Sequence, residues 1–497
     1  MKKMNLLAMS LVSAAALSFS SCSNNDDLTG GGTQSQADGV YMTLKISGAT
    51  SHGTRTSVTD GKTTTDNGSV AESTITEGMM YIYDGPTCVF RKVITKDMFE
   101  TAPTQTTSGV TKPIKVAVTG AITTGKKYDV YFLANRTNVD NPIAATSIFT
   151  SNTGGADFAT DNKFVMFNQN DGTKAAAHSK VEFTDAAKSD KSPAAADEIK
   201  LDRVVARIDN PSFDESVKTV TPAENTTTSI NVADVVAGIS YEGFAVSNLN
   251  NNSYVMQNWD TKFKTLNVKW GEPKYSLPKS DYGTLYNAAG LVNFSSKENP
   301  VSWKYAFENT TTDVNDATAV YFKVKVALTE TANNASDFKD GTFYRYDGRL
   351  YTSIQAIYND AATGAISNPF TETSSITPAD VVAKISDADG KLTTDEAKLA
   401  QFRQDYKIEV YRQGVMYYRW AISDNAYKPF IASETTHTYS VLRNSIYRLK
   451  VTKVSEIGKD VPNGPEPDDP VKNPNFYMNV TVSINPWVLN AQPIELK

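Results

Sequence analysis

Short runs in which apolar and polar residues alternate recur along this chain, and a period of two is typical of half-buried β-strands. In the first run, residues 40–47, the apolar residues that share one face are Val40, Met42, Leu44 and Ile46. In residues 320–328 the predicted inward face is Phe322, Val324, Val326 and Leu328, while Tyr321, Lys323 and Lys325 point outward. Other strand-like runs are 79–83, 114–118, 128–134, 201–208, 243–246, 406–412, 416–422 and 447–454. The pattern predicts an all-β fold.

The residue composition agrees with this fold class. Thr, Val, Ser, Asn, Tyr and Asp, which favour strands and turns, are abundant, whereas long helical stripes of Leu, Glu and Ala are scarce. A chain of 497 residues with 40% hydrophobic content is long enough for two large cores. Since a second series of strand-like runs begins after Pro211, we predict two tandem β-sandwich domains, residues 56–210 and residues 211–458. Gln413 and Gly414 are predicted to form a hairpin turn.

The charge balance excludes two classes of partner. Asp and Glu (55) exceed Lys and Arg (49) by six, and both signs are mixed along the chain. Because no field of one sign would attract nucleic acid or an anionic lipid surface, we expect neither partner. Cys22 belongs to the export signal described next, which leaves Cys88 without a disulfide partner in the rest of the chain. Cys88 stands beside Val89 and Phe90 and is expected to be a small buried apolar residue.

The N-terminus has the pattern of an export signal. Two lysines precede an apolar run over residues 4–17, which is too short to span a bilayer. The run ends at Ser20-Ser21-Cys22, where small residues before a cysteine favour a lipoprotein signal peptide, residues 1–21, with lipid attached to Cys22. Phe19 departs from the usual aliphatic residue of such a signal, and an ordinary secretory signal with an incidental cysteine is the alternative. The polar, acidic residues that follow are typical of tethers of surface lipoproteins.

Two further segments lie outside the predicted sandwiches. Arg55 stands in a polar loop after the first strand, where a protease would reach it, although it is also one surface arginine among many. Residues 459–475 contain five prolines and predict an extended, solvated linker. The tail beyond it, residues 476–497, begins with an alternating strand and then reaches Trp487. The apolar face of that strand is Phe476, Met478, Val480, Val482 and Ile484.

The first strand and the tail strand resemble each other. Residues 41–47 read Tyr-Met-Thr-Leu-Lys-Ile-Ser and residues 477–483 read Tyr-Met-Asn-Val-Thr-Val-Ser, with the apolar positions aligned. If the first strand were cut away, its sheet would expose an apolar groove with unpaired backbone groups. The tail strand of a second molecule would fill that groove by strand addition, and such a head-to-tail contact does not close, so it generates a fibre. Chance similarity between short alternating strands is the alternative.

The chain also resembles the fimbrillins of Bacteroidales type V pili, in particular the branch that forms the shaft of the short, Mfa-type fimbria. The segments that carry this resemblance are 128–135, 202–208, 248–257, 305–310, 414–422 and 443–451. Their order and spacing along the chain, from the lipoprotein signal to Trp487, make the resemblance more specific than any one of them.

The resemblance implies two transthyretin-like β-sandwich domains with an exchangeable N-terminal strand and C-terminal donor strands. It implies a lipid-anchored precursor at the outer membrane, in which residues 22–55 are a propeptide that an arginine-specific protease removes at Arg55. Residues 476–497 would then be the donor, with other copies of the chain and the tip and anchor subunits of an extracellular fimbria as partners.

No catalytic or metal-binding constellation competes with this interpretation. The three histidines, His52, His178 and His437, lack the spacing of a zinc site or a triad, so we expect neither an enzyme nor a cofactor. The loop after Asp387 imitates a calcium site, but its first ligand position would be Ile385. The rival function is a monomeric, glycan-binding surface lipoprotein, with tyrosines such as Tyr344 and Tyr346 stacking on sugars.

Overall fold

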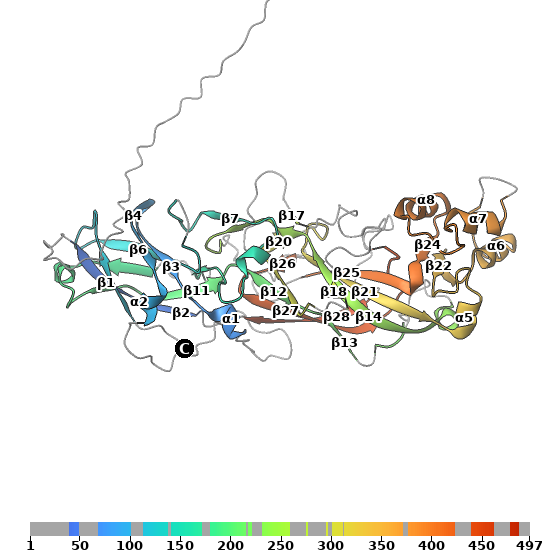
Figure 1. Ribbon diagram of the computed structural model, residues 1–497, viewed down its shortest axis with the longest axis horizontal. Coiled ribbons are helices and arrows are strands. Elements are labelled where there is room, and N and C mark those ends of the chain that lie inside the picture. The colour runs from blue at the N-terminus through green and yellow to red at the C-terminus, as the bar shows by residue number, and fades with distance from the viewer. Residues whose placement is uncertain are drawn as a thin grey trace, which may run out of the picture.

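The protein is elongated, with strand β1 at one end and helices α6, α7 and α8 at the other (Figure 1). It is described here from a computed structural model. The residues that the structure describes are 39–48, 68–100, 113–137, 141–170, 179–214, 217–220, 231–258, 275–276, 295–296, 301–311, 313–370, 376–422, 439–461 and 478–486. Within them, no helix is both long and apolar enough to cross a membrane.

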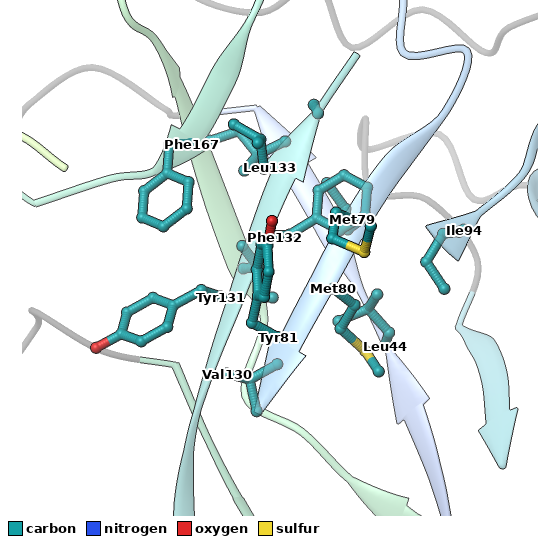
Figure 2. Close-up of a cluster of buried hydrophobic side chains, with 14 of the residues drawn as sticks. Leu44, Met79, Met80, Tyr81, Ile94, Val130, Tyr131, Phe132, Leu133 and Phe167 are labelled. Atoms are coloured by element: carbon teal, nitrogen blue, oxygen red, sulfur yellow. The ribbon is translucent and has the colours of Figure 1, made fainter. Parts of the chain in front are cut away.

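Two sheets enclose the first core. The smaller has the order β10-β1-β5 and consists of β10 (Ala194–Ala195), β1 (Val40–Leu44) and β5 (Ile114–Val118). The larger has the order β2-β11-β8-β6-β3-β4, with β9 (Ser179–Glu182) paired to β6. Its strands are β2 (Ile46–Gly48), β11 (Ile199–Arg203), β8 (Met166–Asn168), β6 (Lys127–Ala134), β3 (Gly78–Asp84) and β4 (Thr87–Ile94). Leu44, Met80 and Ile94 belong to the one buried cluster between these sheets (Figure 2).

The second core lies between two further sheets. One has the order β13-β27-β12-β19 with β28 paired to β27, and consists of β13 (Ser212–Phe213), β27 (Ser445–Val454), β12 (Ala206–Asp209), β19 (Trp303–Ala306) and β28 (Met478–Pro486). The other has the order β18-β14-β21-β25, from β18 (Ser295–Ser296), β14 (Val236–Ser247), β21 (Ala319–Leu328) and β25 (Val415–Ala421). Buried residues of both sheets form one cluster, so the predicted β-sandwich class is confirmed.

Short elements complete the fold, and one pair of short strands, β7 with β16, joins the two halves of the molecule. The paired short strands are β7 (Ile148–Thr150) with β16 (Asn252–Tyr254), β15 (Leu249–Asn250) with β17 (Tyr275–Ser276), and β20 (Asn309–Thr311) with β26 (Tyr439–Val441). The short helices are α1 (Val70–Ser73), α2 (Lys96–Glu100), α3 (Val232–Val235), α5 (Glu330–Asn334), η1 (Ala156–Phe158) and η2 (Asp185–Lys188). Three residues that follow strands of the second half in sequence are buried in the first core. They are Val255 and Met256, after β16, and Phe307, after β19.

A third core, which the sequence did not predict, occupies the far end of the molecule. Residues 330–411, called here the helical module, contain α6 (Ile354–Ala362), α7 (Pro378–Lys384) and α8 (Glu396–Tyr406) beside a sheet of order β23-β22-β24. The strands are β23 (Arg349–Tyr351), β22 (Phe343–Tyr346) and β24 (Glu409–Tyr411). Leu399, Phe402 and Tyr406 of α8 are buried at helical spacing in this core.

Two local predictions were wrong. Tyr321 was expected to point outward, but it is fully buried, because both faces of β21 are covered over its first half. The expected hairpin at Gln413 and Gly414 does not form, since β24 pairs with β22 whereas β25 pairs with β21. The turn η3 (Arg412–Gly414) instead carries the chain from the helical module back into the second sandwich.

Gly414 tests this connection. It has φ +77°, and an added Cβ would lie 2.3 Å from the backbone oxygen of Val326, so Gly414→Ala is expected to lower the free energy of unfolding by roughly 2–4 kcal/mol in denaturant melts. Gly364 has a similar φ of +74° but no atom near that Cβ, so Gly364→Ala should cost only about 1 kcal/mol. Equal losses in both variants would contradict the close approach at Gly414.

Candidate functional site

The leading strand β1 lies between two other strands of its sheet. It runs antiparallel to β5, with Met42 opposite Val116, and parallel to β10, with Met42 opposite Ala194. A strand with a neighbour on each side has its backbone groups paired along both edges. Removal of β1 would therefore leave two unpaired edges facing one vacated slot.

Residues 40–48, called here the leading segment, contain β1 and continue as β2 into the larger sheet. The carbonyl of Thr43 accepts a hydrogen bond from the Ala196 amide at 3.1 Å, and the carbonyl of Lys45 accepts one from the Ile199 amide at 2.9 Å. β2 then pairs with β11 in parallel, with Ile46 opposite Ile199. The leading segment thus spans both sheets of the first sandwich and follows residues 194–201 over most of its length.

The alternation of the leading segment places its apolar side chains in the first core. Met42, Leu44 and Ile46 are 0% exposed and Val40 is 6% exposed, whereas Lys45 is exposed. At roughly 1.5–3 kcal/mol for each fully buried side chain, these four contribute on the order of 6–12 kcal/mol of hydrophobic burial. The slot that they fill is therefore both apolar and lined by strand edges.

The tail strand β28 pairs with β27 of its own chain. The pairing is antiparallel, and Val482 stands opposite Leu449 and Ile484 opposite Tyr447. Among the described strands β27 is the partner of β28, so β28 is an edge strand held along one side. Four predicted site residues, Cys22, Arg55, Phe476 and Trp487, lie outside the described residues.

A buried carboxylate holds α1, the first element described after β2. Glu72 of α1 is 0% exposed, and its carboxylate accepts hydrogen bonds from the Ser69 amide at 2.6 Å, the Arg207 guanidinium at 3.0 Å and the Tyr305 hydroxyl at 2.8 Å. The backbone carbonyl of Glu72 also accepts from Arg203 Nε at 2.8 Å. α1 is thereby fixed to β12 and β19 near the middle of the molecule (Figure 1).

A second buried ion pair lies at the start of β27. Arg443 is 1% exposed; its Nε donates to Glu308 Oε2 at 2.8 Å and its Nη1 to the Val255 carbonyl at 2.7 Å. Gln257 donates to the other oxygen of Glu308 at 2.6 Å. Asn444 connects this pair to the first, since its amide donates to Asp202 at 2.9 Å and its Oδ1 accepts from Arg203 at 3.2 Å.

These contacts form one polar joint between the two sandwiches. Its members are Glu72, Asp202, Arg203, Arg207, Gln257, Tyr305, Glu308, Arg443 and Asn444. Except for Glu72, they come from four of the segments that carry the family resemblance in the sequence, 202–208, 248–257, 305–310 and 443–451. The sequence identified these segments but gave no sign that their polar residues meet.

The residues considered above for enzyme, metal and sugar sites have ordinary structural surroundings where the structure describes them. Cys88 is half-buried rather than buried, and its thiol donates to the Phe90 carbonyl at 3.4 Å. Tyr344 is fully buried in the helical module, so it offers no platform for a sugar, and Tyr346 is half-buried. Asp387 Oδ1 accepts from the amides of Asp389 and Lys391, both at 2.9 Å, as in an ordinary turn. The three histidines lie outside the described residues.

Residues 409–493 match the family model described as major fimbrial subunit protein type IV, fimbrillin, C-terminal. No curated protein matches the chain. Similar solved structures include a fimbrillin, FimA, of Porphyromonas gingivalis, at 14% identity and TM-score 0.39, with 91% of this chain and 99% of that chain covered. The tip fimbrial protein Mfa3 of the same species gives 12% identity and TM-score 0.33, with 90% and 100% covered. A Parabacteroides distasonis protein assigned to cell adhesion gives 13% identity and TM-score 0.41, with 92% and 99% covered.

The leading segment can be tested by truncating one buried side chain. Leu44→Ala removes a fully buried side chain from the first core and is expected to lower the free energy of unfolding of the uncut chain by about 2–5 kcal/mol in denaturant melts. Lys45→Ala, at the exposed neighbouring position, should change it by less than about 0.5 kcal/mol. Indistinguishable melts for the two variants would show that the segment is not seated as described.

The joint can be tested through pH. Burial raises the pKa of Glu72, but the Ser69 amide, the Tyr305 hydroxyl and Arg207 together hold it below its usual range. A carboxyl whose pKa is lower in the folded state stabilises the fold above its unfolded pKa of about 4.3, and this stabilisation is lost as pH falls through the folded value. Glu72→Gln should cost on the order of 3 kcal/mol at pH 7, and the difference from wild type should shrink below about pH 4.

The control for this pH series is Glu198→Gln, at an exposed position. It should leave the free energy of unfolding within about 0.5 kcal/mol of wild type at every pH. A Glu72→Gln deficit that stays constant down to pH 2.5 would argue against an ionised Glu72 in the joint.

Proposed function

We propose that this chain, which carries the C-terminal region of a fimbrillin, is a structural subunit of a cell-surface fimbria and polymerises by exchange of strands. The observation that supports this most directly is the position of the leading segment, whose apolar side chains fill the first core and whose backbone pairs on both sides. Once the segment is gone, the sheet needs a replacement strand. The contact between subunits in this proposal is that replacement.

In this proposal the precursor is anchored in the outer membrane by lipid on Cys22, and an arginine-specific protease then cuts at Arg55. The site stands between the end of β2 at Gly48 and the first contacts of α1, so a cut there passes through no element that the structure describes. Residues 22–55 leave, while the polar joint holds the chain from Ser69 onward. The two sandwich domains of the mature subunit would meet after Arg203 rather than after residue 210, because β12 already belongs to a sheet of the second sandwich.

The donor is the tail, residues 476–497. Its alternating pattern places five side chains on one face, Phe476, Met478, Val480, Val482 and Ile484, and the first four repeat the apolar positions of the leading segment. Burying them would supply on the order of 10 kcal/mol before ordering costs. Because β28 pairs with β27 in the single chain, the tail must leave β27 before it can serve a neighbour. Residues 462–477 allow this movement, since 16 residues span up to about 55 Å when extended.

The partners in this proposal are other copies of the chain along the shaft, together with accessory tip and anchor subunits. A shaft position is favoured by the presence of the donor tail. The rival, a monomeric glycan-binding lipoprotein, would keep its leading segment and gains no support from the buried Tyr344.

Polymerisation is tested with the purified precursor and an arginine-specific protease. The cut wild-type chain is expected to give a ladder of multimers that resists detergent and collapses on heating. Arg55→Ala should stay monomeric, and a chain that ends at Pro474 should be cut but remain a monomer.

Three outcomes would oppose the proposal. Wild type would be cut at Arg55 and stay monomeric, as the rival function requires. The chain ending at Pro474 would form the same ladder as wild type. Arg55→Ala would assemble after protease treatment as well as wild type does.

A further inference from the structure

The seven residues between β27 and the proline-rich linker are mostly buried and hydrogen-bonded, although they follow the end of the strand. Residues 455–461 are called here the exit segment. The sequence predicted that a solvated linker begins within them, at residue 459. Asp460 is instead 6% exposed and Val461 is 2% exposed. The described chain therefore stays packed in the fold through residue 461.

The helical module supplies one set of contacts to the exit segment. The buried carboxylate of Asp460 accepts a hydrogen bond from the Val410 amide at 2.9 Å and forms an ion pair with Arg403 of α8, which is half-buried. The Lys459 ammonium lies 3.3 Å from the Glu409 carboxylate of β24. These contacts join α8 and β24 to the last residues before the linker.

Three more groups bind backbone carbonyls of the exit segment. Tyr411 Oη donates to the Gly458 carbonyl at 2.8 Å, and Arg345 Nη1 donates to the Ile457 carbonyl at 3.1 Å. Tyr418 Oη of β25 donates to the Glu456 carbonyl at 2.7 Å. Two of the three donors belong to the helical module, and all three are directed at consecutive residues.

The second sandwich contacts the exit segment by backbone pairing. The amide of Tyr417 donates to the Lys459 carbonyl at 2.7 Å, and the Lys459 amide donates to the Tyr417 carbonyl at 2.8 Å. The approach is so close that a Cβ on Gly458 would lie 2.5 Å from the Tyr417 oxygen. Consecutive residues from Glu456 to Asp460 are thus bound from two directions.

The position of the exit segment in the molecule indicates what these contacts would do in a fibre. The exit segment adjoins β24 and α8, at the end of the molecule opposite β1 (Figure 1). A tail that leaves there and fills the slot of the next subunit connects the two ends of successive molecules. Tension along such a fibre reaches each subunit first at residues 455–461.

We propose that the helical module is a mechanical anchor, which binds the exit segment so that tension on the donor tail does not peel β27 out of the second sandwich. This inference rests on the proposed function, since the fibre is the source of the tension. Its central contact is the ion pair between Asp460 and Arg403, and the two-way backbone pairing of Lys459 with Tyr417 of β25 supports it from the second sandwich. Because they hold the adjacent residues Lys459 and Asp460 from two directions, tension loads them together rather than one after another.

Pulling single molecules tests the anchor. The full chain is held by one handle at the C-terminus and one at Thr87, an exposed residue of the first sandwich, and stretched in optical tweezers. In wild type, the first stretch of chain that is pulled free from the C-terminus should end at residue 461. In Asp460→Ala it should extend through residues 455–461, which adds about 24 Å of contour for seven residues, and at lower force.

Arg349→Gln is the matched control, because it breaks an ion pair of 3.2 Å with Asp360 inside the same module without touching the exit segment. It should release the same contour length as wild type at the same force. Equal contour and force in wild type and Asp460→Ala, or the same change in Arg349→Gln, would overturn the anchor.

Hydrogen exchange on the wild-type chain gives a readout that no folding defect can obscure. The Val410, Tyr417 and Lys459 amides should exchange as slowly as the central amides of β21, and exchange at the rate of a surface loop would overturn the anchor. Both measurements are made on the chain before any polymerisation. A failure to polymerise would therefore refute the proposed function while leaving these results to be judged separately.

Discussion

The structure depends on the need of every buried backbone amide and carbonyl for a hydrogen-bond partner. β1 satisfies this need for two neighbours at once, because it lies between β5 and β10, and its continuation β2 does the same for one edge of β11. An apolar side chain can be truncated at moderate cost, but an empty central position leaves two rows of polar groups and a cavity together. A chain built this way is complete only while some strand occupies that position.

The proposed exchange requires the remainder of the fold to hold while this one position changes. Its neighbour in sequence, α1, is held by Glu72 in a buried polar joint, and both sandwiches share that joint. Buried ion pairs add little net stability compared with apolar packing, yet breaking one is costly, so they favour a single relative arrangement of the parts they connect. The hydrogen bonds that define the joint connect residues outside the leading segment, which the proposed exchange removes. In the proposed fibre, tension from the other end would meet a comparable set of contacts at Asp460.

The sequence predicted the sandwiches because strand alternation is a local signal. The alternation of residues 40–47 and 322–326 identified side chains that the structure buries. The helical module escaped notice because its apolar residues are sparse: α8 has three buried residues among eleven. Its capping signals, Thr377-Pro378 with Asp380 and then Asp395, stand in the sequence and would have indicated two helix starts.

The polar joint was beyond sequence reasoning for a different cause. Arg443 and Glu308 are 135 residues apart, as are Arg207 and Glu72, and nothing local distinguishes these buried pairs from solvated charges. The failed hairpin at Gln413 has the same origin, since the partners of β24 and β25 are distant strands rather than each other. Pairing between distant segments decided what local turn chemistry could not.

The most direct test of the account is hydrogen exchange at the Ala196 and Ile199 amides, which donate to the carbonyls of Thr43 and Lys45. After cleavage and removal of the leading segment from a chain that ends at Pro474, both amides should exchange rapidly. Addition of a peptide of residues 475–497 should protect them again. Amides that stay protected after removal, or that remain rapid with saturating peptide, would contradict the claim that the tail replaces the leading segment.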